Sequence, residues 1–352
     1  MYSRTVRFVL LTVLIVPASG CLPDAVVWTP DGKSLVYTED RGTRVVRYDL
    51  TAKERHVLEE NTNSQTTWPA VSPDGKLIAV ARAVRDGEEP GTMEIVLLDM
   101  EGQEVKSSKE FPWLPADKTA KGKRTFATAL FWGASAQHLL VFSEEKTGIY
   151  DVEQDALVVL DKVVPFPLGN SPVRPDGKGF LSLVTGLERT EVAFIDWEGK
   201  RRKIDVKWEL KAAELRWEKD VAHLIGPDGV LDFDTTRLTA AFRIDKPELL
   251  PTDGDLALLH TFPDGKTKVC VYDWIEKSAT KRDQMHQRVE IQRLGEKKRD
   301  ILERRTRGIV SLYPSPDRKL VAVRYRPEGF QKQVIAIIDA SGKVVQEIDV
   351  KD

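Results

Sequence analysis

The chain has 352 residues, of which 41% are hydrophobic and 31% are charged, and its formal net charge is −2. This composition can bury a large core, so it excludes both a disordered chain and an integral membrane protein. The near-neutral charge gives no general reason to expect nucleic acid as a partner.

The first twenty residues have the pattern of an export signal peptide. Arg4 and Arg7 form a charged start, residues 8–16 form a nine-residue apolar region, and "PASG" provides a small-residue end. Nine apolar residues are too few to span a bilayer, which needs about twenty. We therefore expect residues 1–20 to be removed, so that the mature chain begins at Cys21.

The segment "ASGC", Ala18 to Cys21, resembles the lipobox of bacterial lipoproteins, although Ala18 stands where that family most often has leucine. The resemblance implies that Cys21 is diacylated, and several acyl chains together anchor a protein stably because each buried methylene contributes roughly 0.8 kcal/mol. Leu22 follows the cysteine where retention in the inner membrane would often show aspartate. This implies an anchor in the outer membrane, facing the periplasm or the cell surface. The alternative is an ordinary signal-peptidase site with Cys21 as a free thiol.

One motif repeats along the rest of the chain. "PDG" follows short apolar runs with its proline at positions 30, 73, 175 and 263, and "SPDRK" adds a copy at 316 with Arg318 in place of the glycine. Two further copies align at Ala134 and Lys219, each just after a matching tryptophan. Most of the spacings between these seven anchors are close to 43 residues. A recurring period of this length predicts a repeat architecture.

The second copy shows the internal pattern of the repeat most clearly. "PAV" enters the turn "SPDG", "KLIAVARA" leaves it as an alternating strand, and "MEIVLLDM" and "QEVKSS" are the third and fourth strands. Such a four-stranded antiparallel meander of about forty residues has the size of a β-propeller blade. A single sheet cannot bury both faces, so the blades must stack and close into a ring. We predict an all-β, seven-bladed β-propeller as one domain over residues 21–352, with six or eight blades as the alternative counts.

The repeat resembles the PD-type, WD40-like propeller repeat of the TolB protein of bacterial envelopes and of the propeller domains of prolyl oligopeptidases. The resemblance covers nearly the whole mature chain and is specific for fold rather than for function. TolB-like proteins have an additional N-terminal domain and the peptidases an α/β-hydrolase domain, and we expect neither here. The resemblance therefore implies a bare propeller on a lipid tether.

Residues that could carry chemistry are mostly explained by the repeat. No G-x-S-x-G nucleophile elbow is present, and the five histidines fall in five expected blades without zinc-binding spacing. Only His260 lies on an expected innermost strand. Aspartates recur in the turns and at the ends of third strands, where we expect them to accept hydrogen bonds from turn amides. Trp28, Trp132 and Trp217 share one repeat position and are expected to pack between blades. We expect no metal and no cofactor.

The geometry of a meander divides its connections between two faces of the disc. The turns that join the first to the second strand and the third to the fourth share one face, whereas the segments 85–92, 107–124 and 275–286 share the other. Such loops often carry function, and the basic character of the last two suits an acidic protein, a glycan or lipid headgroups. The alternatives are a solvated charged surface and, for Trp113, packing back onto its own domain. The candidate binding residues are Phe111, Trp113, Lys118, Lys121, Lys123 and Arg124.

These observations predict a monomeric, non-enzymatic binding scaffold, tethered to an envelope membrane, that presents the loop-rich face to another protein or polymer. The alternative is a propeller enzyme, such as a lactonase, a lyase or a quinoprotein dehydrogenase, with its site in the central channel. An enzyme would need several His, Asp, Glu or Arg side chains on the innermost strands. Those strands, among them "AELRW" and "LALLHTF", offer few such groups.

Overall fold

The structure is a computed structural model, and it describes the greater part of the chain. The described residues are 26–60, 69–84, 92–111, 128–143, 146–165, 171–185, 190–206, 213–276, 284–306, 310–329 and 332–351. Within them lie two short 3-10 helices, η1 (Asp40–Gly42) and η2 (Leu294–Glu296). No helix of these residues is long and apolar enough to cross a membrane.

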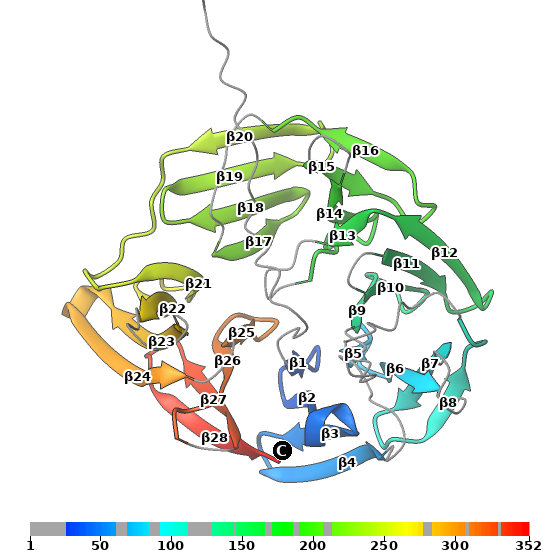
Figure 1. Ribbon diagram of the computed structural model, residues 1–352, viewed down its shortest axis with the longest axis horizontal. Coiled ribbons are helices and arrows are strands. Elements are labelled where there is room, and N and C mark those ends of the chain that lie inside the picture. Colours follow the sequence, from blue (N-terminus) through cyan, green and yellow to red (C-terminus); the bar gives the residue numbers. More distant parts are fainter. Residues whose placement is uncertain are drawn as a thin grey trace, which may run out of the picture.

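The described strands form seven antiparallel sheets of four strands each, which we call blades 1 to 7 (Figure 1). Blade 1 contains β1 (Val26–Trp28), β2 (Ser34–Glu39), β3 (Arg44–Asp49) and β4 (Glu54–Glu60). Blade 2 contains β5 (Ala70–Val71), β6 (Leu77–Val84), β7 (Thr92–Asp99) and β8 (Glu104–Ser107). Blade 3 contains β9 (Thr128–Trp132), β10 (His138–Ser143), β11 (Lys146–Asp151) and β12 (Ala156–Asp161).

The remaining four blades follow in chain order. Blade 4 contains β13 (Val163–Pro165), β14 (Phe180–Thr185), β15 (Thr190–Ile195) and β16 (Arg201–Ile204). Blade 5 contains β17 (Glu214–Glu218), β18 (Val221–Gly226), β19 (Gly229–Asp234) and β20 (Thr239–Arg243). Blade 6 contains β21 (Asp255–Thr261), β22 (Thr267–Glu276), β23 (Gln284–Arg293) and β24 (Lys298–Thr306). Blade 7 contains β25 (Ser311–Pro314), β26 (Leu320–Tyr325), β27 (Gln333–Asp339) and β28 (Val344–Val350).

The chain is a seven-bladed β-propeller, as the repeat predicts. In each blade the strands follow one another from the centre of the ring outward, and we call them A, B, C and D (Figure 1). All seven anchors of the sequence repeat lie between the A and B strands of their blades. The alternation of strand direction puts the A–B and C–D turns on one side of the disc, the first face, and the B–C and D–A connections on the other, the second face.

The aspartate of the "PDG" turn is a structural residue. In blade 1, Oδ1 of Asp31 accepts hydrogen bonds from the Thr29 hydroxyl (2.6 Å) and from the Lys33 amide (3.0 Å). The bond from the amide two residues later recurs in four other blades, at Asp74, Asp176, Asp264 and Asp317. Gly32 has a φ of +70°, which glycine adopts without strain. The turns of the first face therefore satisfy their own polar groups, as predicted.

Apolar side chains between neighbouring blades form the core. Each of the seven interfaces contains a cluster of buried apolar residues, because β-branched and aromatic side chains alternate across both sides of the sheets. Six of these clusters contain eight to twelve buried residues, whereas the cluster between blades 5 and 6 contains five. The interface between blades 5 and 6 is therefore the least apolar of the ring.

The three tryptophans at one repeat position link blades, as expected. Each indole Nε1 donates to a backbone carbonyl of the preceding blade in the ring. Trp28 bonds the carbonyl of Tyr313 (2.7 Å), and Trp132 bonds that of Ala70 (2.9 Å). Trp217 bonds the Ser171 carbonyl with the longer distance of 3.3 Å. The bond of Trp28 also joins the last blade to the first, so it helps to close the ring.

Candidate functional site

Phe111 is the predicted binding residue that the structure describes, and it packs against the disc. Its backbone exchanges two hydrogen bonds with Met93, at 2.7 and 3.2 Å. Its ring lies edge-on to that of Tyr150 in blade 3, with 5.9 Å between the centroids. Close to it, the Thr92 hydroxyl donates to Glu110 (2.6 Å). These contacts bring the described end of the segment 107–124 beside that of the B–C connection of blade 2.

The other predicted site residues lie outside the described residues, so their roles stay predictions. They are Cys21, Trp113, Lys118, Lys121, Lys123 and Arg124.

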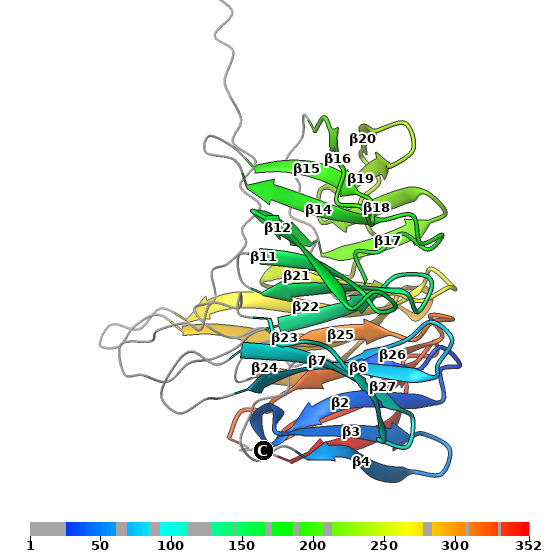
Figure 2. The same cartoon turned by 90° about the vertical axis from the view of Figure 1, so that its right-hand side faces the viewer.

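Blade 6 extends farther on the second face than its neighbours. Its middle strands, β22 and β23, have ten residues each, whereas the middle strands of the other blades have six to eight. Figure 2 shows the disc edge-on, with these yellow strands protruding beyond the adjacent blades. The described tip of the hairpin thus stands out from the second face, at the B–C connection 275–286 that the sequence predicts there.

The tip of this hairpin combines apolar, aromatic and charged side chains. Ile275 is 64% exposed, and the ring of Trp274 lies 5.5 Å from that of His286 on the paired strand. The guanidinium of Arg288 lies 5.7 Å from the centroid of the Trp274 ring, within the range of a cation–π contact. Glu276 forms an ion pair with Arg305 of β24. Tryptophan is typical of the anchors of protein interfaces, and the exposed Ile275 beside it adds apolar surface to the tip.

Polar groups take the place of apolar packing between blades 5 and 6. On the blade 6 side, Glu290 and Gln292 of β23 are fully buried. The Thr252 hydroxyl donates to Glu290 Oε1 (2.9 Å), and the Leu250 amide donates to Gln292 Oε1 (2.8 Å). The buried ammonium of Lys268 donates to the Glu248 carbonyl (2.8 Å). The segment 244–254 therefore packs against blade 6 through hydrogen bonds to buried polar side chains.

The blade 5 side of this interface is also polar. His223 Nδ1 lies 2.6 Å from Asp232 Oδ1, and Arg243 Nε donates to Asp232 Oδ2 (2.9 Å). Hydrogen bonds from His223 and Arg243 outweigh burial and hold the pKa of Asp232 below its ordinary value. Asp232 is therefore an anion with two partners.

A second group of polar residues lies at the inner edge of blades 5, 6 and 7, and we call it the axial cluster: Glu214, Arg216, His260 and Arg318. Glu214 and Arg216 belong to β17, the innermost strand of blade 5, whereas Arg318 lies in the A–B turn of blade 7. Glu214 is almost fully buried, and its Oε1 accepts from Nη2 of Arg318 (2.6 Å) and of Arg216 (3.3 Å). One carboxylate oxygen thus holds two guanidinium groups.

His260 of β21 completes the axial cluster and is fully buried. Neither ring nitrogen has a hydrogen-bond partner of normal geometry among the described residues, although the Arg318 backbone comes near the ring. Burial, together with the positive charges of Arg318 and Arg216, lowers the pKa of His260 to about 3. His260 is therefore neutral at physiological pH.

One prediction about the distribution of the histidines among the blades needs correction. The expectation that the five histidines occupy five blades is wrong, because His260 of β21 and His286 of β23 both belong to blade 6. The long strands of this blade place His286 at the tip of its hairpin, far along the sheet from His260. Within the described part of the chain, no group of three or more His, Cys, Asp or Glu side chains is arranged to hold a metal ion.

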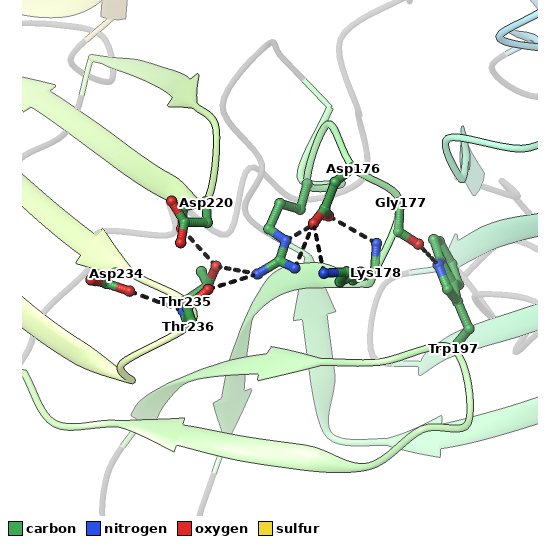
Figure 3. Close-up of polar contacts among 9 residues, drawn as sticks. Asp176, Gly177, Lys178, Trp197, Asp220, Asp234, Thr235 and Thr236 are labelled. Carbon is green, nitrogen blue, oxygen red and sulfur yellow. Dashed lines mark hydrogen bonds and ion pairs between the residues drawn. The ribbon is translucent and has the colours of Figure 1, made fainter.

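A further polar group, around Arg174, locks blade 4 to blade 5 on the first face (Figure 3). Arg174 is buried and donates from Nε and Nη2 to the two carboxylate oxygens of Asp176, both at 2.7 Å. Its Nη1 donates to the Thr235 hydroxyl (3.0 Å), which in turn donates to the Asp220 carbonyl (2.7 Å). All donors in this group have partners within the fold, so we assign it to stability.

The amino-acid sequence was compared with protein families and with curated proteins. No protein-family model matches the chain. A curated relative, dipeptidyl-peptidase 5 of Porphyromonas gingivalis, is 30% identical over 83 residues, which are 21% of this chain and 12% of that protein. The chain therefore spans a small part of the length of this relative.

Three solved structures are similar over most of this chain. They are hydrazine synthase of Kuenenia stuttgartiensis (15% identity, 90% of this chain, 76% of that chain, TM-score 0.43), the dihydro-heme d1 dehydrogenase NirN in complex with DHE (14%, 93%, 66%, 0.48) and TolB of Acinetobacter baumannii (15%, 94%, 63%, 0.41). The chain covers less than two thirds of the TolB chain. At such identities the likeness concerns the fold alone.

Sequence reasoning missed the axial cluster, although one signal for it was present. Arg318 replaces the glycine of the "PDG" turn in blade 7, and a bulky residue at a position that favours glycine is a local departure from the repeat. Glu214 and Arg216 were visible in the innermost strand "AELRW". What the sequence could not show is that Arg318 reaches across blade 6 to meet Glu214, because that contact joins residues 104 positions apart.

Proposed function

We propose that this chain is a binding scaffold that presents the second face of its propeller to another protein or polymer of the bacterial envelope. In this proposal Cys21 carries the lipid anchor, and the outer membrane holds the protein. The observation that carries the proposal is the protruding hairpin of blade 6, with the exposed Ile275 next to Trp274 and Arg288. The side chains of Ile275 and Trp274 bury well against a partner because they have almost no polar groups to desolvate.

The contrast between the two faces supports this choice. On the first face, the aspartates of the turns are engaged by the amides of their own turns, and the buried Arg174 has its partners inside the fold. On the second face, the contacts of Phe111 with Met93 hold the described end of the segment 107–124 on the same side of the disc as the hairpin of blade 6, and we infer that the basic residues that follow Phe111 lie on this side too. A partner on this face could therefore contact both an apolar anchor and a basic segment.

The experiment compares two substitutions of exposed β-branched residues. Ile275→Asp alters the tip of the hairpin on the second face, whereas Val345→Asp alters a 47% exposed position of β28 that follows the C–D turn on the first face. The full chain, with an affinity tag, is cross-linked chemically in bacterial envelopes and recovered. We expect Ile275→Asp to reduce recovery of the cross-linked partner by about tenfold, the effect of about 1.4 kcal/mol. We expect the Val345→Asp chain to behave as the unaltered chain.

Thermal unfolding of both variants controls for damage to the fold. Full recovery with Ile275→Asp, or loss of the partner with Val345→Asp alone, would contradict the choice of face.

A further inference from the structure

Arg318 adopts a backbone conformation that its side chain makes costly. Its φ is +60°, while the glycines at the same position in blades 1, 2, 4 and 6 have φ between +69° and +72°. Only glycine adopts this left-handed region without a steric penalty, and other residues persist there when the surrounding structure compensates them. Backbone strain of this kind concentrates at functional sites. We therefore expect contacts of the Arg318 side chain to compensate the cost of this backbone conformation.

The guanidinium of Arg318 extends along the inner edge of the ring and forms hydrogen bonds with two other blades. Nη2 of Arg318 donates to Glu214 Oε1 (2.6 Å) and to the Thr261 carbonyl (3.0 Å), so a turn of blade 7 binds the innermost strands of blades 5 and 6. Nη2 of Arg216 shares the same carboxylate oxygen at 3.3 Å. Glu214 thus brings two guanidinium groups together, although like charges repel.

The axial cluster leaves several buried polar atoms without partners. Among the described residues, Glu214 Oε2, Arg216 Nε and both ring nitrogens of His260 have no hydrogen-bond partner of normal geometry, although the Arg318 backbone lies near the His260 ring. A buried polar atom without a partner is costly, and most such atoms in proteins are paired with protein, water or a ligand. His260 is fully buried and lies near both arginines, and their positive charges act on its ring. The gathering of such atoms in one group indicates that a further molecule supplies some of their hydrogen bonds.

We propose that the axial cluster binds a small anionic molecule through a carboxylate or phosphate group held between Arg216 and Arg318. Guanidinium groups offer several coplanar donors that match the oxygens of either group, and Glu214 uses only one donor atom of each arginine. The single carboxylate of Glu214 leaves the pair of arginines with an excess positive charge, which an anion neutralises. The neutral ring of His260 adds one donor and one acceptor for a hydroxyl or amino group of the same molecule.

This inference is independent of the proposed scaffold function, since it concerns the inner edge of blades 5 to 7 and not the tip of the hairpin. Either can fail without the other.

The test measures binding of two probe anions to the full chain by isothermal titration calorimetry. Sodium succinate and sodium phosphate are titrated at constant ionic strength, with sodium chloride as the reference. We expect saturable binding of one anion per chain for at least one probe, and the tighter of the two identifies the preferred group.

The variants Arg216→Ala and Arg318→Gly should each weaken this binding by at least tenfold. Arg318→Gly restores the glycine of the repeat and relieves the backbone strain, but it also takes one partner from the buried Glu214, so thermal unfolding of both variants checks that each is folded before binding is compared. Arg237→Ala is the matched control, because this arginine of blade 5 lies in a C–D turn with its side chain 83% exposed. It should bind the probe normally. The absence of saturable binding by both probes, or equal binding by all three variants, would overturn the proposal.

Discussion

His260 makes the stability of the propeller depend on pH in a way that one substitution should remove. The ring is fully buried beside Phe262, with 4.7 Å between the ring centroids, and its folded-state pKa of about 3 lies well below the ordinary value of 6.5. As the pH falls below about 6.5, the unfolded chain binds a proton at this residue while the folded chain does not. Protonation therefore favours unfolding, and stability that is present above pH 6.5 is lost as the pH falls toward 3.

The expected size of the effect follows from these two pKa values. Each pH unit between them corresponds to about 1.4 kcal/mol of differential proton binding. Between the ordinary pKa of 6.5 and pH 5, the folded chain of the unaltered protein should lose about 2 kcal/mol through His260 alone. Leucine has a similar volume and no ring nitrogens, so His260→Leu removes this loss and leaves two buried polar atoms fewer to satisfy.

The assay is urea unfolding of both proteins at pH 7 and pH 5, with the difference between the two pH values compared for each protein. Other titrating groups are common to both and cancel in this comparison. The unaltered chain should lose about 2 kcal/mol more than His260→Leu on acidification. The same loss in both proteins would show that His260 is not held in its neutral form, and the reasoning about its burial would be wrong.

Three further predictions concern the blade contacts and the anchor. Arg174→Met should lower the free energy of unfolding by about 1–3 kcal/mol, because Asp176 and Thr235 lose a buried charged partner; urea unfolding measures it. Trp132→Phe should cost about 1–2 kcal/mol in the same assay, since the Ala70 carbonyl stays buried without its donor. Cys21→Ala should release the protein from membranes on fractionation, and an unchanged membrane fraction without an acyl mass would contradict the anchor.

The architecture was predictable because its signals are local. A "PDG"-type turn, or the tryptophan that stands before it, marks each of the seven blades, and both make their contacts within a few residues or with the adjacent blade. Counting those copies gives the number of blades without any knowledge of long-range contacts. The same locality explains why the turn aspartates could be assigned to structure, since Asp31 bonds residues only two positions away.

The candidate sites were less predictable because they depend on distant residues. Arg318 meets Glu214 across an intervening blade, and no periodic pattern reports which side chains reach inward. The polar interface between blades 5 and 6 has a similar origin. Its buried Glu290 and Gln292 are satisfied by the segment 244–254, the D–A connection that joins blades 5 and 6. The sequence did place the connection 275–286 on the second face, but it did not show that Ile275 and Trp274 would lie at the tip of a protruding hairpin.

Site-specific photo-crosslinking in living cells tests most directly whether the second face of the propeller binds a partner. A photoreactive amino acid is placed at position 275, on the hairpin of the second face, or at position 178, where an exposed lysine side chain lies in a turn of the first face. We expect a defined adduct of higher mass from position 275 and none from position 178. An adduct from position 178 alone, or equal adducts from both, would show that this propeller binds its partner with the other face or with no preferred face.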